Sequence, residues 1–252
     1  MTFRLSFGAS IASFVGVCAS CSLLDYGSLD RDFGTDASEA DSGAESGADT
    51  IEIVGSTQAD PSGTVTVPIS LPPKTEPGDL AIVILQARDG ASVTAPTGFT
   101  STSQAAGSCG GYLTTFLVKV VAEGEVSAGY TFTLSRSDDV GAILTAFRHA
   151  TPIVASSIAT SRVDADSTGH MPVGPISVSD PTDVQWLGVS SVYQSSNWGA
   201  PSGMTLAASA QTVAVFTSTG LPAGTTGSLV VQGPDENGGC GAVGFVSLAL
   251  AR

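Results

Sequence analysis

The stretch Pro77-Gly-Asp-Leu-Ala-Ile-Val-Ile-Leu85 joins a turn signal to a continuous apolar run, and Pro181-Thr-Asp-Val-Gln-Trp-Leu-Gly-Val189 resembles it about 100 residues later. A short apolar run bounded by Pro, Gly and Asp is typical of a buried strand. Similar runs predict strands at 63–70, 79–87, 112–121, 129–135, 140–148, 152–158, 173–178, 184–193, 211–217, 227–232 and 242–250. The sequence therefore predicts an all-β domain over 53–252, folded as an antiparallel β-sandwich.

Two further pairs of segments extend the repeat. Ala95-Pro-Thr-Gly-Phe-Thr100 resembles Ala200-Pro-Ser-Gly-Met-Thr205, and the run at 140–148 resembles that at 243–252. In the first pair Pro fixes a corner, Gly allows a positive φ, and the apolar residue returns to the core. The repeats cover 77–148 and 181–252 and are too few for a solenoid. We expect a jelly-roll-like sandwich of two related, interlocked halves, each donating strands to both sheets.

The first 20 residues have the composition of an export signal. Arg4 precedes an uncharged, mostly apolar run at 5–20 that ends in small residues. This order is typical of a signal peptide. The run is shorter than the roughly 20 residues of a spanning helix, so a permanent membrane span is the weaker interpretation.

The signal ends in Ala19-Ser20-Cys21, and here the chain resembles a bacterial lipoprotein. The resemblance implies lipid attachment at Cys21, a membrane anchor, and sorting to the outer membrane or cell surface, with which Ser22 is compatible. Cys18 is the poorer candidate because the bulky Val17 precedes it. The alternative is an ordinary cleaved signal with neither cysteine modified, which implies a periplasmic or secreted protein.

Residues 21–52 are predicted to be a disordered acidic linker. From residue 25 onward this segment holds nine acidic residues and one base, Arg31. Such a segment cannot offset its ordering entropy, and its like charges repel one another. As a flexible coil it spans about 30 Å and acts as a spacer.

Composition excludes several classes of function. The chain has 9 Lys and Arg against 23 Asp and Glu, a net charge of −14, so no basic surface exists to neutralise nucleic-acid phosphates. It has no Gly-rich phosphate loop followed by a helix and no Gly-x-Ser-x-Gly nucleophile elbow. We expect no cofactor and no enzymatic activity.

The repeated motifs of 53–252 also resemble a β-sandwich module of bacterial surface proteins and phage tail-associated proteins. The resemblance lies in the Gly-Asp-Leu strand, the Ala-Pro-x-Gly corner and the closing strand that ends at Arg148. It implies a display, adhesion or binding module whose partner is a glycan or a surface protein. The oligomeric state is left open.

Cys109 and Cys240 both lie in Gly-rich segments. In an exported chain such a pair is predicted to form a disulfide. Two thiolates alone do not make a zinc site, because zinc takes four ligands.

Three weaker site predictions remain. The loop residue Trp198, with Tyr193 and Asn197 nearby, could stack on a sugar ring, although covering one end of the sandwich is the preferred role. Asp164, Asp166 and Thr168 match the first half of a calcium loop, but Pro175 stands where the bidentate Glu is needed. A carboxylate-dependent hydrolase would need a facing acid pair, and the candidates are Asp138/Asp139, Asp164/Asp166, Asp180/Asp183 and Asp235/Glu236.

Overall fold

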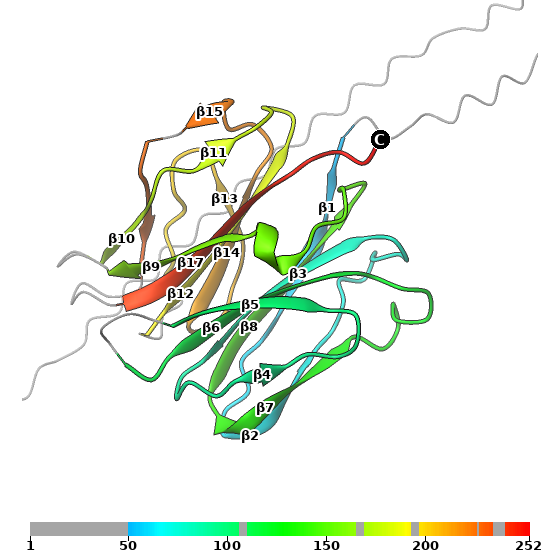
Figure 1. Cartoon of the computed structure of the whole chain (residues 1–252), viewed down its shortest axis with the longest axis vertical. Helices are drawn as coiled ribbons and strands as arrows, with labels where there is room; N and C mark the ends of the chain where they lie inside the picture. The colour runs from blue at the N-terminus through cyan, green and yellow to red at the C-terminus, as the bar shows by residue number, and fades with distance from the viewer. Residues whose placement is uncertain (1–49, 106–109, 165–168, 193–196, 226, 234–239) are drawn as a thin grey trace, which may run out of the picture. The chain divides into compact units, whose positions relative to one another are not determined.

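The computed structural model describes residues 50–105, 110–164, 169–192, 197–225, 227–233 and 240–252. It confirms the predicted all-β class, since every strand pair among the described residues is antiparallel, and the connections between these strands include the 3-10 turn Ala155–Ser157 (Figure 1). No helix in the described part of the chain is long and apolar enough to cross a membrane.

The first half of the domain is a sandwich of two sheets. A five-stranded sheet faces a three-stranded one, and alternate residues of their strands fill the space between them, among them Val67, Phe132, Val83 and Leu144. In pairing order the larger sheet is β1 (Glu52–Ala59), β8 (Val140–Arg148), β3 (Leu80–Ala87), β6 (Leu113–Val120) and β5 (Thr100–Ala105). The smaller sheet is β2 (Thr64–Ile69), β7 (Tyr130–Asp138) and β4 (Val93–Thr94).

The second half repeats this arrangement with a divided outer layer. Its five-stranded sheet is β13 (Thr205–Ser209), β14 (Val213–Ser218), β12 (Val184–Ser191), β17 (Cys240–Leu248) and β9 (Ala159–Asp164). Two short pairs cover it, β10 (His170–Val173) with β16 (Leu229–Gln232) and β11 (Ser177–Val178) with β15 (Gly224–Thr225). Met171 and Val231 of these pairs pack on Leu187 and Phe216.

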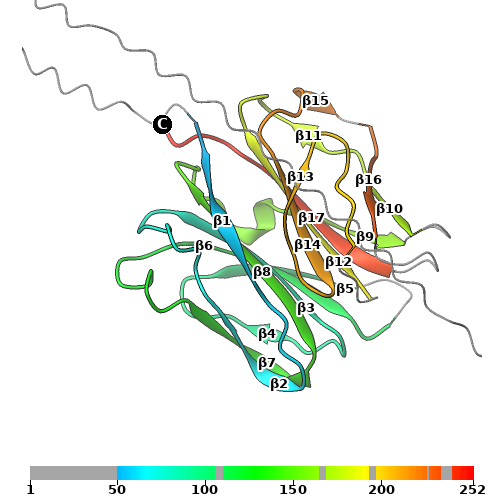
Figure 2. The same ribbon diagram turned by 180° about the vertical axis from the view of Figure 1, so that it is seen from behind.

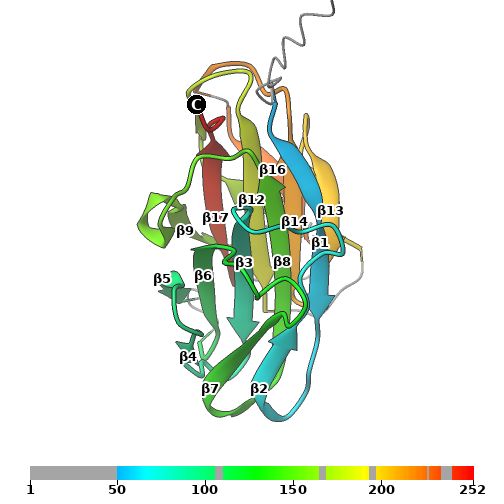
Figure 3. The ribbon, with the colours of Figure 1, turned by 90° about the vertical axis from the view of Figure 1, so that its right-hand side faces the viewer.

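A third core joins the halves, because the two five-stranded sheets pack against each other (Figures 1 and 3). Alternate residues of β3 point into this central layer, so Ile82 and Ile84 meet Trp186 and Val215 there. Every residue of β3 and β12 is therefore buried, which explains their continuous apolar runs. The edge strands β1 and β13 lie side by side across the layer (Figures 2 and 3).

The expectation of interlocked halves was wrong. All strands of one five-stranded sheet come from residues 52–148 and all strands of the other from 159–248, so neither half donates strands to the other's sheets. The strand order is nevertheless the same in both, since β1-β8-β3-β6-β5 corresponds by position to β9-β17-β12-β14-β13. The halves meet chiefly through the faces of their five-stranded sheets, with further contacts between loops such as the bond from the Gln211 N–H to Asp60.

The two Ala-Pro-x-Gly corners have the predicted conformation. Gly98 has a φ of 91° and Gly203 a φ of 82°. In each turn the following residue donates its N–H to the proline carbonyl, Phe99 to Pro96 at 3.4 Å and Met204 to Pro201 at 3.1 Å. Phe99 and Met204 then pack on the cores of their own halves, as the sequence predicted.

Candidate functional site

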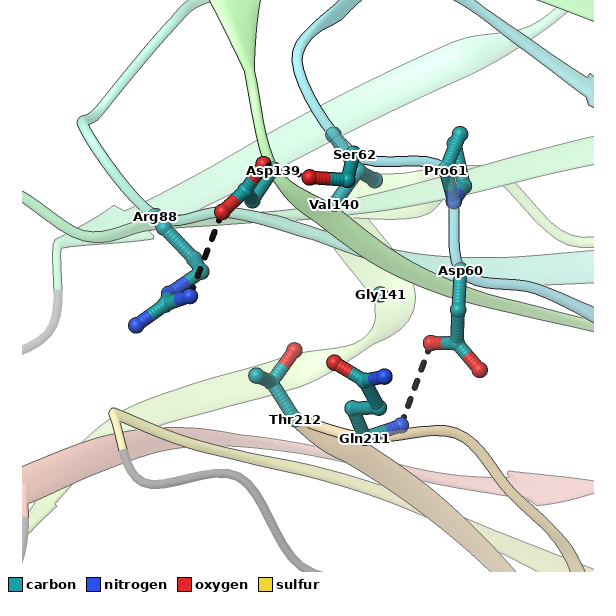
Figure 4. A pocket seen from close by; sticks show the side chains of 9 residues that line it. All are labelled: Asp60, Pro61, Ser62, Arg88, Asp139, Val140, Gly141, Gln211 and Thr212. Atoms are coloured by element: carbon teal, nitrogen blue, oxygen red, sulfur yellow. Dashed lines mark hydrogen bonds and ion pairs between the residues drawn. The ribbon is translucent and has the colours of Figure 1, made fainter.

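A polar pocket of about 250 Å³ opens at the boundary between the two halves (Figure 4). Four connections build it: the β1–β2 loop, the residue after β3, the β7–β8 junction and the β13–β14 turn. Its lining residues are Asp60, Pro61, Ser62, Arg88, Asp139, Val140, Gly141, Gln211 and Thr212. Because the last two belong to the second half, the pocket exists only where the halves meet.

Asp139 organises one wall of the pocket. Its Oδ1 accepts hydrogen bonds from Ser62 Oγ at 2.6 Å and from the Gly63 N–H at 2.8 Å, and its Oδ2 accepts one from Arg88 Nη1 at 3.2 Å. These bonds, that of Ser62 most of all, and the Arg88 charge hold the pKa of Asp139 below its ordinary value. Asp139 therefore stays ionised and fixes both the β1–β2 loop and the Arg88 guanidinium.

Asp60 stands on the opposite side and bridges the halves. Its Oδ1 accepts the backbone N–H of Gln211 at 3.1 Å (Figure 4). Burial raises the pKa of Asp60, and the bond from Gln211 offsets part of that rise. The pocket thus holds two carboxyl groups whose environments shift their pKa values in opposite directions.

Thr212 forms the floor of the pocket. It is 2% exposed, and its Oγ1 has no hydrogen-bond partner among the described residues. Gly141 makes room for it, since a Cβ at Gly141 would lie 2.4 Å from Thr212 Oγ1, and Figure 4 shows that oxygen turned toward Gly141. Gln86, paired with Gly141 across β3 and β8, is fully buried, and both atoms of its amide lack partners in the described structure. Buried polar groups left unpaired are uncommon, and those that border a cavity can be satisfied by water or by a ligand.

Trp198 does not present a ring for stacking. It is 6% exposed and packs in the core of the second half beside residues such as Met204 and Val231. Trp198 therefore presents little ring face for the sugar stacking considered above, and its ring is instead part of the core of the second half. Asn197 is exposed, and Tyr193 lies outside the described residues.

The structure bears only in part on the calcium and cysteine predictions. Asp164 ends β9, is exposed and pairs in register with Cys240, whereas Asp166, Thr168, Cys18, Cys21 and Cys109 lie outside the described residues. No group of three or more His, Cys, Asp and Glu side chains that could hold a metal occurs in the described part of the chain. Cys240 is buried beside Val192, and Tyr112, three residues after Cys109, packs against both.

The other candidate carboxylates that the structure describes accept hydrogen bonds from nearby turns and strands. Asp138 is buried and accepts the backbone N–H groups of Asp89, Ala91 and Asp139. Asp180 accepts the N–H and hydroxyl of Thr182, and Asp183 accepts the hydroxyl of Ser247. Asp235 and Glu236 lie outside the described residues.

Of the residues that line the pocket, only Asp139 was among the candidates predicted from the sequence. Asp139 was named as half of an acid pair, whereas Asp60, Arg88 and Thr212 carried no signal. Asp60 lies in Asp-Pro-Ser-Gly, which is typical of an ordinary turn. Thr212 is significant only because a long-range contact with Gly141 buries it.

No protein-family model matches the chain, and comparisons with curated proteins and with solved structures gave no match.

Proposed function

We propose that the chain is a non-enzymatic, lipid-anchored envelope or surface protein that displays its β-sandwich domain as a binding or adhesion module. The anchor is Cys21, preceded by a signal peptide at 1–20 and followed by the acidic linker. The location is the outer membrane or cell surface, with a periplasmic or secreted protein as the alternative.

The main support for this proposal is that the pocket lies at the opposite end of β1 from the point where the chain enters the domain. The chain enters the domain at the start of β1, and the C-terminus lies near the same end (Figure 1). The pocket begins at Asp60, directly after the other end of β1. Eight extended residues span about 26 Å, so the pocket lies about that far along β1 from the point where the chain enters the domain. A module tethered at one end and open at the other is suited to display.

We further propose that the two halves arose as related copies. Their five-stranded sheets have the same strand order, and the paired segments of sequence fall on corresponding strands and corners. The pocket at the boundary is then formed only when both copies are present, because its lining residues come from both.

A carboxylate-dependent hydrolase is the second candidate, favoured by the opposite pKa shifts of Asp60 and Asp139. One observation weighs against it. Both oxygens of Asp139 already accept hydrogen bonds from Ser62, Gly63 and Arg88, so this carboxylate serves to hold the wall of the pocket. A catalytic base or nucleophile needs a free oxygen facing the substrate.

Metabolic labelling tests the anchor. The full chain is expressed with radiolabelled palmitate in a bacterial host that acylates exported proteins, beside the variants Cys21→Ser and Cys18→Ser. We expect label in the wild type and in Cys18→Ser, and none in Cys21→Ser, because the lipid is attached through the Cys21 thiol. Label that survives in Cys21→Ser would refute attachment at this residue.

A further inference from the structure

We propose that the pocket at the boundary of the halves binds a neutral, polyhydroxylated ligand the size of one saccharide ring. This inference rests on the proposed role of the domain as a binding module and names the class of ligand. The key observation is the unpaired hydroxyl of Thr212, which is buried on the floor of an otherwise open polar cavity.

The pocket offers both donors and acceptors, as a sugar hydroxyl requires. Thr212 Oγ1 can donate one hydrogen bond and accept others. Arg88 has five N–H donors, of which one is bonded to Asp139 in the described structure, so the others are available to ligand oxygens. Asp60 uses Oδ1 to accept from Gln211 and keeps Oδ2 to accept from a ligand hydroxyl. A hydroxyl group is the ligand group that satisfies both kinds of partner.

The balance of charge disfavours ionic ligands. Two carboxylates and one guanidinium line the pocket, so a phosphate or carboxylate would face a net negative wall. A divalent cation would need several free oxygens, yet Asp139 is already bonded on both oxygens and lies against the Arg88 cation. A neutral ligand avoids both penalties.

The size and the apolar surface fit a single ring. Cavities for drug-sized ligands begin at about 300 Å³, and this pocket is about 250 Å³. Pro61 and Val140 also line the pocket and supply apolar contacts for the C–H groups of a ring. Gln86, buried beside Gly141, adds further unpaired polar atoms behind the floor.

Ligand-observed saturation-transfer NMR on the full chain tests the proposal. The NMR probes are glucose, mannose and N-acetylglucosamine at millimolar concentration. Inorganic phosphate and Ca²⁺, which have no protons to observe, are titrated in parallel by isothermal calorimetry as ionic comparisons. We expect at least one saccharide to bind, and Thr212→Val to weaken that binding by about tenfold, because the variant keeps the shape of the side chain and removes the hydroxyl. Asp60→Asn serves as a second variant at a position less buried than Thr212, and we expect it to weaken binding as well.

Thr75→Val is the matched control. Thr75 is also buried with an unpartnered hydroxyl, but it does not line the pocket, so its loss is expected to leave binding unchanged. The proposal would be overturned if none of the three saccharides bound, or if phosphate or Ca²⁺ bound in their place. It would also be overturned if both Thr212→Val and Asp60→Asn bound the saccharide as well as the wild type does. Palmitate labelling tests lipid attachment in a separate experiment. A negative result there can therefore be told apart from a failure of the saccharide to bind.

Discussion

At the residue scale, Lys119 shows how this domain buries a charge. Its side chain is 8% exposed, and Nζ donates to Glu125 Oε1 and to the Thr97 carbonyl at 2.8 Å. Nζ also lies 5.6 Å from the centre of the Phe99 ring and 5.3 Å from that of Tyr130. Lys119 thereby ties the first Ala-Pro-x-Gly corner to β6 and β7.

Glu125 makes this arrangement sensitive to pH. Burial alone would raise the pKa of Glu125, but hydrogen bonds from Lys119, the Ala122 N–H and Tyr130 hold it below its ordinary value. A carboxyl with a lowered pKa stabilises the fold above its unfolded pKa of about 4.3 and loses that contribution as the pH falls through the folded value.

We therefore expect Glu125→Gln to reduce the loss of stability in acid. Urea denaturation at neutral and acidic pH measures the free energy of unfolding, and its fall between the two should be smaller in the variant than in the wild type. Glu123→Gln, at an exposed neighbouring position, is expected to keep the wild-type fall. An identical pH dependence in Glu125→Gln and wild type would contradict the role assigned to Glu125.

Functional residues were the least predictable part of the chain. Asp139 was found as an acidic residue in a turn, but its role depends on Ser62 and Arg88, which come from other connections. Trp198 was considered as a loop residue that could stack on a sugar, and the fold buries its side chain instead. Neither outcome follows from local sequence, because burial is decided by segments distant along the chain.

At the element scale, the strands that the sequence predicted are mostly those buried in the five-stranded sheets. β3, β8 and β12 were located within a residue or two because apolar runs mark them. The edge strands β1, β5, β9 and β13 were missed, since a half-exposed edge needs few apolar residues and β5 reads Thr-Ser-Thr-Ser-Gln-Ala. The strand predicted at 152–158 is a loop with a 3-10 turn, where Ala155 and Ile158 pack on the central layer.

Two paired glycines form a hollow in the second five-stranded sheet. Gly188 of β12 lies opposite Gly244 of β17. The Phe116 ring from the other half lies over Gly244 and the Trp186 ring lies over Gly188. The two rings pack edge to face with centroids 6.2 Å apart. A Cβ at Gly244 would lie 2.5 Å from a carbon of the Phe116 ring. The contact between the halves therefore requires glycine at these two positions, because any side chain there would collide with an aromatic ring.

We expect Gly244→Ala to destabilise the domain by about 1–3 kcal/mol, the usual cost of overpacking a core. Thermal or urea unfolding followed by circular dichroism measures this. Gly220→Ala is the control, because a Cβ there meets nothing within 4 Å, and we expect a change within about 0.5 kcal/mol. Equal stability of Gly244→Ala and wild type would mean that Phe116 does not occupy the hollow.

At the scale of the whole molecule, the central core makes the two halves one folding unit. Apolar side chains of the first half are fully buried in this layer because side chains of the second half cover them. The covered residues are Phe116, Ile82 and Ile143, and those that cover them are Trp186, Val213 and Val215. A half alone would expose this entire layer to water, which is costly for a large apolar surface.

We expect the halves to unfold together in a single transition. The two tryptophans, Trp186 and Trp198, both lie in the second half, so their fluorescence reports on that half, whereas far-UV circular dichroism reports on both. Urea titrations followed by the two signals should share one midpoint. Separate midpoints would show that the central core does not couple the halves.

The sequence predicted two halves, but not how their strands would pair. Similar segments indicated two halves, and they are equally compatible with strands exchanged between sheets and with complete sheets stacked face to face. The difference is decided by the pairing of the polar edge strands β1 and β9, which carry little apolar signal.

The central claim is that this domain is held at a membrane by a lipid on Cys21. Mass spectrometry of the N-terminal peptide of the protein purified from bacterial membranes tests it most directly. We predict a mature chain that begins at Cys21 and carries a mass increase equal to a lipid group on that residue. An unmodified Cys21, or an N-terminus at another residue, would contradict the account.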